Sequence, residues 1–224
     1  MKHYDSFENI KYDQLLLGEE IWASNKIDGQ NFCAKYSPKQ KEFTMFGSKT
    51  QNVDETSEQF GKAVQYFKLN MTATIKKIII DNSKKGGVFT GIEEITIFCE
   101  WYGENTFSGF HIPGEELKLC LIDIFLKKKG YIEPKIFYKL FDGYSNIEVP
   151  ELIYSGKLTK DFINSIVNND WTKPNCLYPN VKEGVVCKRS TLMKGQRMPK
   201  AKIKTGWWLN KLTELYPDRW KELE

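Results

Sequence analysis

The sequence predicts an α+β fold in which largely antiparallel sheets are flanked by helices. Segments with strand-like alternation come in clusters instead of alternating regularly with helices, which is typical of antiparallel sheets. Other segments carry an apolar stripe at helical spacing. Hydrophobic residues make up 41% of the 224 residues, which is enough for a core. That length predicts a single domain over residues 1–224.

The expected strands are short segments in which the side chains alternate in character. In 95–102, Ile97 and Cys99 fall on one face, and Phe98 and Glu100 fall on the other. The same reasoning gives the full set of expected strands: 21–27, 31–36, 42–46, 95–102, 117–125, 184–189 and 200–205.

The expected helices are 57–80, 134–141, 159–167 and 207–223. Pro134 in a first turn and Thr159 as an N-cap support two of these starts. The first helix carries one apolar stripe, made of Val64, Phe67, Met71, Ile75 and Ile78. The polar segment 81–87 is expected to be a loop within one domain.

Several classes of protein are excluded. With only His3 and His111, the chain cannot form a His-rich metal centre. The five cysteines are odd in number and widely spaced, which indicates reduced thiols. Residues 1–9 lack the apolar run of a secretory signal, and no apolar run approaches the roughly 18 residues of a membrane span. We therefore expect a cytoplasmic protein with no membrane segment, whose chemistry uses lysines and carboxylates.

Positive charge is concentrated near the end of the chain. The net charge of the whole chain is +4, but residues 182–211 alone carry +8, with Glu183 as the single acid. Such a segment suggests a surface for a polyanion or a phosphate-rich ligand. The alternative is an ordinary solvated lysine face. The nine basic residues are Lys182, Lys188, Arg189, Lys194, Arg197, Lys200, Lys202, Lys204 and Lys211.

The tetrapeptide Lys26-Ile27-Asp28-Gly29 stands where an expected strand ends. The sheet would hold the lysine amine at its rim as a nucleophile, and glycine permits a close backbone approach. Taken alone, so short a motif is as well explained by a turn.

Five further motifs follow in order: Phe46-Gly47-Ser48-Lys49-Thr50, Phe98-Cys99-Glu100-Trp101-Tyr102-Gly103, Leu121-Ile122-Asp123-Ile124, Glu183-Gly184-Val185-Val186 and Lys202-Ile203-Lys204-Thr205. With the first, the series resembles motifs I, Ia, III, IIIa, IV and V of the covalent nucleotidyltransferases. These are the ATP-dependent DNA ligases, the RNA ligases and the mRNA capping guanylyltransferases. Each motif is weak, but the ordered series from Lys26 to Thr205 is specific.

Phage-type RNA ligases of the RNA-ligase-2 branch are the most similar, on the basis of Asn31 and the segments 103–109 and 129–134. The resemblance implies the nucleotidyltransferase (ligase adenylation) fold. Since few residues follow Lys204, we expect no OB domain. The resemblance leaves open that a partner supplies the missing substrate-binding domain. The resemblance to phage enzymes leaves open that the protein is virus-encoded and acts in a host cell.

The resemblance implies that Lys26 attacks the α-phosphorus of ATP to form lysyl-AMP, and that Lys202 and Lys204 bind the α-phosphate. A neutral lysine amine is needed for attack, so cationic neighbours and desolvation must lower a side-chain pKa that is normally about 10.4. Glu183 is the expected ligand of Mg²⁺, with Mn²⁺ as an alternative ion. The implied ATP-binding set is Lys26, Asp28, Gly29, Asn31, Lys49, Glu100, Ile122, Asp123, Glu183, Lys202 and Lys204.

Individual roles follow in the same way. Glu100 matches the acid that holds ribose hydroxyls, and Lys49 matches a cation near the ribose or the outer phosphates. Asp123 matches the motif IIIa acid, although an acid that caps the edge of the core fits as well. Ile122 stands where relatives often carry an aromatic residue against adenine. Asp28 stands where RNA-ligase-2 relatives often have histidine, whereas DNA ligases and capping enzymes have aspartate.

We expect the nucleic acid to bind Lys188, Arg189, Lys194 and Arg197, with RNA preferred over DNA as the substrate. Trp207 and Trp208 either stack on bases or anchor the last helix. The expected function is an ATP-dependent RNA ligase that seals 5′-phosphate and 3′-hydroxyl ends. The alternatives are a minimal DNA ligase, a capping-type guanylyltransferase and a non-catalytic nucleic-acid-binding module.

Overall fold

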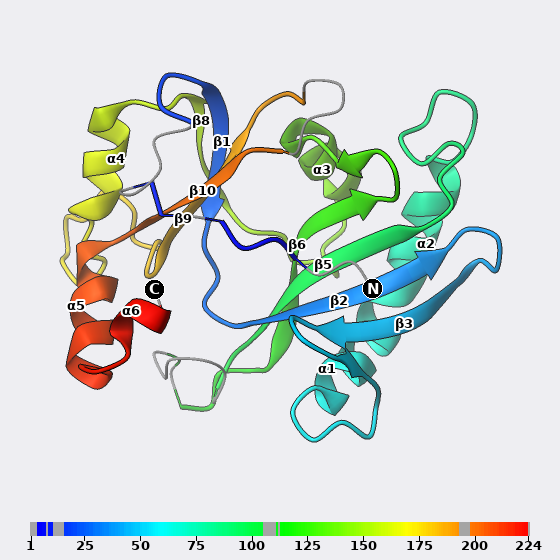
Figure 1. Ribbon diagram of the computed structural model, residues 1–224, viewed down its shortest axis with the longest axis horizontal. Coiled ribbons are helices and arrows are strands. Elements are labelled where there is room, and N and C mark those ends of the chain that lie inside the picture. The colour runs from blue at the N-terminus through cyan, green and yellow to red at the C-terminus, as the bar shows by residue number, and fades with distance from the viewer. Residues whose placement is uncertain are drawn as a thin grey trace. The chain divides into compact units, whose positions relative to one another are not determined.

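The computed structural model describes residues 4–7, 9–10, 16–104, 111, 113–192 and 198–223 (Figure 1). The chain divides into two compact units. Unit 1 comprises Met1–Asp5 and Asp28–Val149, and unit 2 comprises Ser6–Ile27 and Pro150–Glu224. The chain therefore passes from one unit to the other three times, and one passage falls inside the Lys26–Gly29 motif.

Unit 1 is built on a six-stranded sheet of order β4-β3-β2-β5-β6-β7. All neighbouring strands pair in the antiparallel sense, as predicted. The strands are β2 (Gln30–Ser37), β3 (Glu42–Ser48), β4 (Asn52–Val53), β5 (Ile95–Tyr102), β6 (Lys118–Leu126) and β7 (Gly130–Tyr131).

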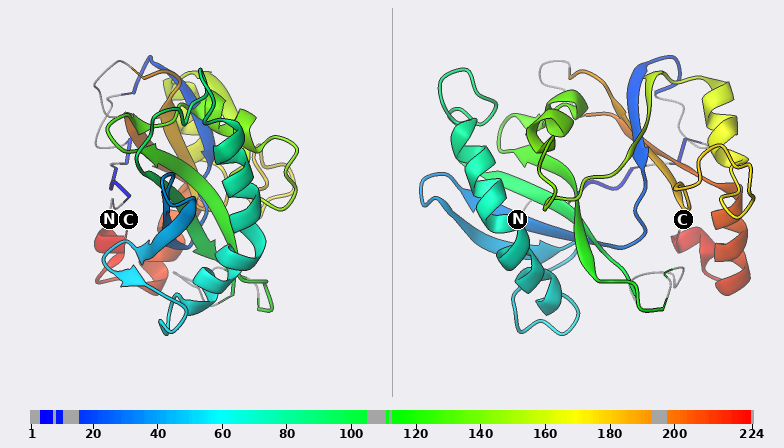
Figure 2. Two further views of the ribbon diagram at one scale, coloured as in Figure 1. Left: turned by 90° about the vertical axis from the view of Figure 1, so that its right-hand side faces the viewer. Right: turned by 180° about the vertical axis from the view of Figure 1, so that it is seen from behind.

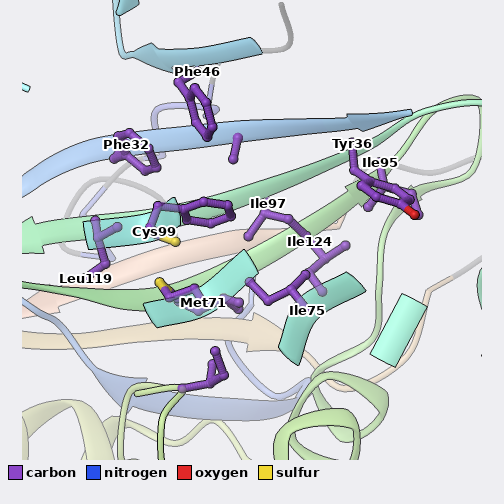
Figure 3. Close-up of a cluster of buried hydrophobic side chains, with 14 of the residues drawn as sticks. Phe32, Tyr36, Phe46, Met71, Ile75, Ile95, Ile97, Cys99, Leu119 and Ile124 are labelled. Carbon is purple, nitrogen blue, oxygen red and sulfur yellow. The ribbon is translucent and has the colours of Figure 1, made fainter. Parts of the chain in front are cut away.

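The helices of unit 1 are α1 (Gly61–Tyr66), the π-helical segment η1 (Phe67–Met71), α2 (Thr72–Asp81) and α3 (Pro134–Phe141). Helix α2 runs along one face of the sheet (Figure 2). The predicted stripe is confirmed, because Phe67, Met71 and Ile75 are buried in one core cluster with Ile97 and Cys99 of β5. Met71 and Ile75 lie within this cluster in Figure 3. Burial of this apolar surface is the main force that holds helix and sheet together.

The predicted helix 57–80 is wrong in two respects. It begins only at Gly61, because Asp54 and Ser57 form a hydrogen-bonded turn before it. It is also interrupted by η1, where the Thr72 hydroxyl donates a hydrogen bond to the carbonyl of Phe67 over 3.1 Å. Such insertions widen one turn of a helix without ending it.

Unit 2 is built on a four-stranded antiparallel sheet of order β10-β9-β1-β8. One face packs on α4, where Phe162 and Ile166 meet Ile21, Val185 and Ile203 of the sheet. The strands are β1 (Glu20–Asn25), β8 (Leu152–Lys157), β9 (Gly184–Arg189) and β10 (Lys200–Lys204). The helices are α4 (Lys160–Val167), α5 (Gly206–Leu215) and α6 (Trp220–Leu223).

Thr159 is confirmed as the N-cap of α4, since its side chain accepts a hydrogen bond from the backbone of Phe162. The predicted helix 207–223 is wrong, because α5 ends at Leu215 and Pro217 prevents its continuation into α6. The sequence also did not predict β4, β7 or β8. Within the described residues, no helix is both long and apolar enough to cross a membrane.

Candidate active site

In unit 2, a buried carboxylate lies between two lysine ammonium groups. Oε2 of Glu183 is 2.9 Å from Nζ of Lys26, and Oε1 is 3.2 Å from Nζ of Lys204. The side chains of Glu183 and Lys204 are only 5% and 3% exposed, whereas that of Lys26 is 22% exposed. The structure thus brings together three residues that the motifs predicted, from three separate segments of the chain.

Strand pairing explains why these segments meet. Lys26 directly follows β1, and its backbone N–H donates to the carbonyl of Gly184 over 2.8 Å. On the other side of β9, Lys204 lies opposite Gly184. A β-carbon on Gly184 would lie 2.1 Å from the carbonyl oxygen of Ile203, and the φ angle of +152° further disfavours a side chain. Glycine after Glu183 is therefore what lets β10 approach.

The charges of this cluster favour an anion. Two ammonium groups and one carboxylate leave a net positive charge in a largely desolvated place, where electrostatic interactions are strengthened. Both carboxylate oxygens already have a lysine partner. A phosphate group entering beside Lys26 and Lys204 would be stabilised by both cations.

Lysines continue along one face of the same sheet. Lys200, Lys202 and Lys204 alternate in β10 with residues that belong to the core. Lys188 of β9 lies directly opposite Lys200. Like charges at opposite positions destabilise an antiparallel pair, so a bound polyanion would stabilise this face.

The other predicted contacts to nucleic acid differ among themselves. Arg189 follows Lys188 and so points to the opposite face of β9, and its guanidinium lies 3.1 Å from Glu19 Oε1. The structure therefore separates Arg189 from the lysines of that face. Lys194 and Arg197 lie outside the described residues.

Unit 1 holds a second group of predicted residues. Asn31 of β2 lies directly opposite Glu100 of β5. Both polar atoms of the Asn31 amide are shielded from solvent, and neither has a hydrogen-bond partner among the described residues. A buried amide without partners is costly, so this side chain is suited to a ligand.

Gly29 precedes this strand and packs closely against β5. A β-carbon there would lie 2.5 Å from the carbonyl oxygen of Trp101 and 3.0 Å from a side-chain carbon of Glu100. Any side chain at position 29 would therefore push β5 away. This close approach is a structural reason for the glycine in the Lys26–Gly29 motif.

Asp123 is almost fully buried in β6. The hydroxyl of Tyr4 donates a hydrogen bond to its Oδ2 over 3.1 Å, and the N–H of Ile124 lies 3.2 Å from its Oδ1. Burial raises the pKa of Tyr4 well above its usual value, and the charge of Asp123 raises it further. Tyr4 thus stays protonated as the donor. Ile122 beside it is partly buried, and Lys49 is exposed in the turn after β3.

Sequence reasoning did not find the partner of Asp28. His111 Nε2 lies 2.8 Å from the carbonyl oxygen of Asp28 and 3.5 Å from its Oδ2. Nδ1 of the same ring lies 2.9 Å from Glu115 Oε2. Within unit 1, His111 therefore links Asp28 to the segment after β5. No sequence signal links residues 83 positions apart.

Among the described residues, no group of three or more His, Cys, Asp or Glu side chains could hold a metal ion. Glu183 is a single buried carboxylate beside two potential phosphate-binding lysines. This donor set fits Mg²⁺, which usually binds one or two carboxylates together with substrate phosphates and water. It does not fit a metal held by the protein alone.

The chain is similar to one protein family and to several solved structures. The model of a family described as RNA ligase matches residues 19–204. A comparison of the sequence with curated proteins gives no match.

The solved structures that resemble the chain include several forms of the RNA ligase of Naegleria gruberi. A lysine-to-alanine mutant with ATP and Mn superposes with a TM-score of 0.63 at 16% identity, covering 94% of this chain. A glutamate-to-alanine mutant with AMP and Mn gives 0.62 at 16% identity and the same coverage. An aspartate-to-alanine mutant without ligand superposes with a TM-score of 0.62 at 17% identity, covering 96% of this chain. In all three, this chain spans 58% of the longer one, and the similarity concerns the fold.

Proposed function

Since the chain belongs to the RNA ligase family, we propose that it is an ATP-dependent RNA ligase. It would join a 5′-phosphate end to a 3′-hydroxyl end through lysyl-AMP and an adenylylated 5′ end. The observation that supports this most is the Glu183 carboxylate between Lys26 and Lys204 in unit 2. Binding of phosphate alone would require the lysines but not a buried acid.

In the first step, the Lys26 amine attacks the α-phosphorus of ATP. Its ammonium must first lose a proton, which the Glu183 carboxylate can accept because it already holds that hydrogen bond. A nitrogen–phosphorus bond forms, the bond from the α-phosphorus to the bridging oxygen breaks, and pyrophosphate leaves. In the second step the 5′-phosphate oxygen displaces Lys26 from AMP, and in the third a 3′-hydroxyl displaces AMP.

Lys204 stabilises the first transition state, because its charge lies beside Glu183 and next to the nucleophile. Preorganised charges that face developing negative charge are often the largest single contribution to catalysis. Lys202 extends the same face of β10 towards the phosphates. Glu183 and the ATP phosphates would hold Mg²⁺, which neutralises phosphate charge when bound.

The residues of unit 1 bind the nucleoside part of ATP in this proposal. Glu100 accepts hydrogen bonds from ribose hydroxyls. The buried amide of Asn31 opposite it, which has no hydrogen-bond partner among the described residues, donates to or accepts from the same nucleotide. Ile122 packs against adenine. Asp28 and Gly29 shape the chain after the nucleophile, Asp123 supports the sheet from within, and Lys49 contacts the ribose or the outer phosphates. The ligands in the Naegleria structures are ATP, AMP and Mn.

The nucleic-acid strand would bind the lysine-bearing face of the unit 2 sheet, through Lys188 and neighbouring lysines. We propose that both units form one adenylation domain of a cytoplasmic protein, and that a partner adds further RNA-binding surface. RNA is proposed as the substrate because the matching family is that of the RNA ligases.

The test is incubation with each labelled nucleoside triphosphate and Mg²⁺, followed by denaturing electrophoresis. A covalent adduct with ATP alone supports the ligase, an adduct with GTP indicates a capping-type enzyme, and no adduct indicates a binding module. Sealing of matched RNA and DNA substrates by the adenylylated protein then distinguishes RNA from DNA ligases.

A further inference from the structure

Two tryptophans and a lysine cluster beside Glu183 in unit 2. The ring centroids of Trp171 and Trp207 are 5.2 Å apart with the ring planes at 77°, and Nζ of Lys182 lies 5.1 Å from the centroid of Trp171. Trp171 belongs to the segment between α4 and β9, Trp207 to the first turn of α5, and Lys182 directly precedes Glu183. These three residues are called the tryptophan–lysine cluster below.

A buried threonine connects this cluster to the candidate catalytic residues. The hydroxyl of Thr205 donates to the carbonyl of Lys182 over 2.8 Å, and its N–H donates to the carbonyl of Glu183 over 3.0 Å. The same hydroxyl accepts a hydrogen bond from the N–H of Trp208 as the N-cap of α5. One residue, itself fully buried, therefore fixes both Lys182 and the start of α5 relative to Glu183, through its hydroxyl and its backbone N–H.

Packing of α5 does not account for the cluster. Trp208 is the tryptophan that anchors this helix, because its side chain is 1% exposed. Trp207 and Trp171 are both partly exposed. The indole N–H of Trp171 is shielded and has no hydrogen-bond partner among the described residues, which is unfavourable unless a ligand supplies an acceptor.

We propose that the tryptophan–lysine cluster binds an unpaired nucleotide of the RNA strand that is being sealed. The base stacks on an indole face, and its phosphate faces Lys182. Aromatic rings next to basic side chains are the usual means of holding single-stranded nucleic acid, because every base has a π face. The segment 182–211, which carries a charge of +8, supplies the matching sign of charge.

This inference rests on the proposed function, and it adds a nucleobase site in unit 2. The proposed site for the base of ATP is in unit 1, beside Asn31 and Glu100, so a second base site is assigned to the strand. A nucleobase with its phosphate could in principle belong to ATP or to RNA. The experiment therefore measures both.

The test uses the full chain with leucine and phenylalanine at the two tryptophans, Trp171→Leu, Trp207→Leu, Trp171→Phe and Trp207→Phe. Binding of a single-stranded, 5′-phosphorylated RNA oligonucleotide is followed by fluorescence anisotropy. Each leucine variant should bind RNA about fivefold to a hundredfold more weakly, and each phenylalanine variant should recover most of that loss. Single-turnover lysyl-AMP formation and the KM for ATP are measured on the same variants and should change much less.

Trp220→Leu is the matched control. Trp220 is also partly exposed, and Nζ of Lys221 lies 5.7 Å from the centroid of its ring, but this pair is in α6 and has no link to Thr205. Its RNA affinity should equal that of the wild type. An equal loss of RNA affinity in Trp220→Leu would overturn the inference, because it would show that any partly exposed tryptophan contributes equally to RNA binding.

The remaining outcomes separate the inference from the proposed function. A rise in the KM for ATP that matches the loss of RNA affinity would assign the cluster to ATP and overturn the inference. Unchanged RNA affinity with normal lysyl-AMP formation would overturn the inference alone, and absence of lysyl-AMP in the wild type would overturn the proposed function alone. If the leucine variants do not fold, the Lys182→Gln variant provides the test. The slope of log RNA affinity against log salt concentration should become about 0.7 less steep in this variant. An unchanged slope overturns the inference.

Discussion

Lys26 and Glu183 are 157 residues apart in the sequence, yet the lysine ammonium donates a hydrogen bond of 2.9 Å to the carboxylate. Glu183 also retains Lys204 as a partner, so the loss of Lys26 would not leave a buried charge uncompensated.

Lys26→Ala should abolish the denaturation-resistant AMP adduct while the protein stays folded. The physical reason is that no other group supplies the attacking amine at this position. Lys35→Ala is the control, because Lys35 is similarly exposed and is paired with Glu94 at 2.5 Å outside the motifs. Adenylation is read by gel and the fold by circular dichroism. An adduct of equal yield in Lys26→Ala would assign the nucleophile elsewhere.

Lys204→Ala and Glu183→Gln should both slow lysyl-AMP formation, but for different reasons. Removing one preorganised charge typically costs about 3–4 kcal/mol in the transition state, or a hundredfold to a thousandfold in rate. Glu183→Gln keeps the shape but weakens metal binding, so added Mg²⁺ should restore part of its rate. Single-turnover rates across a Mg²⁺ titration distinguish the two. Equal rescue of both variants contradicts the assigned roles.

Asn31→Leu should reduce adenylation at least about tenfold without lowering stability, because the buried amide has no partner to lose among the described residues. Asn169→Leu is the matched control. The amide of Asn169 is also buried, but it bonds to the carbonyls of Tyr178 and Val181 and to the N–H of Tyr178. The Asn169→Leu variant should therefore lose about 1–3 kcal/mol of its free energy of unfolding. Urea unfolding of both variants provides the comparison, and a larger loss for Asn31→Leu would refute this account.

Gly184→Ala should destabilise the protein by about 3 kcal/mol or more. The new β-carbon would meet the carbonyl oxygen of Ile203 at 2.1 Å, at a φ of +152°. Gly86 also has a positive φ, +85°, but no atom lies within 4 Å of an added β-carbon. Gly86→Ala should therefore lower the free energy of unfolding by only about 1–2 kcal/mol. The midpoints of urea unfolding measure the difference. Similar costs at both positions would show that the close approach of β10 is not required.

Alkylation of the native protein should modify Cys176 before the other cysteines. Burial raises the pKa of Cys33 and of Cys187 to about 12, so neither thiol ionises near neutral pH. Cys99 and Cys120 are also buried, whereas Cys176 is partly exposed. Peptide mapping after brief treatment with iodoacetamide gives the order. Early modification of Cys33 would mean that β2 opens readily.

The sequence predicted long, strongly patterned elements well. The bounds of β5, β9 and α3 agree with the prediction, because the alternation of Ile95–Tyr102 and the first-turn position of Pro134 are local signals. Strand β8 was not predicted, since Gly156 weakens its pattern and only pairing with β1 selects the extended form. Tertiary context decides such segments.

The candidate site was likewise predictable only in part. Motifs predicted which residues are present, but spacing could not show that Glu183 bonds Lys26 or that His111 holds Asp28. Nor could it show that the Asn31 amide has no partner in the part of the chain that the structure describes. Each of these depends on packing between residues distant in the sequence. The cluster of Trp171, Trp207 and Lys182 carried no local signal at all, because Trp171 lies 36 residues before Trp207.

The position of β1 between β8 and β9 has a consequence for protein synthesis. When β1 leaves the ribosome, neither neighbour has yet been made, whereas unit 1 is nearly complete once Val149 has emerged. Unit 1 is therefore expected to fold first, with the segment that carries Lys26 unstructured until β8 and β9 have been made. A nascent chain stalled before β9 would have no Glu183 beside Lys26, so ATP could not label the chain until β9 has been made.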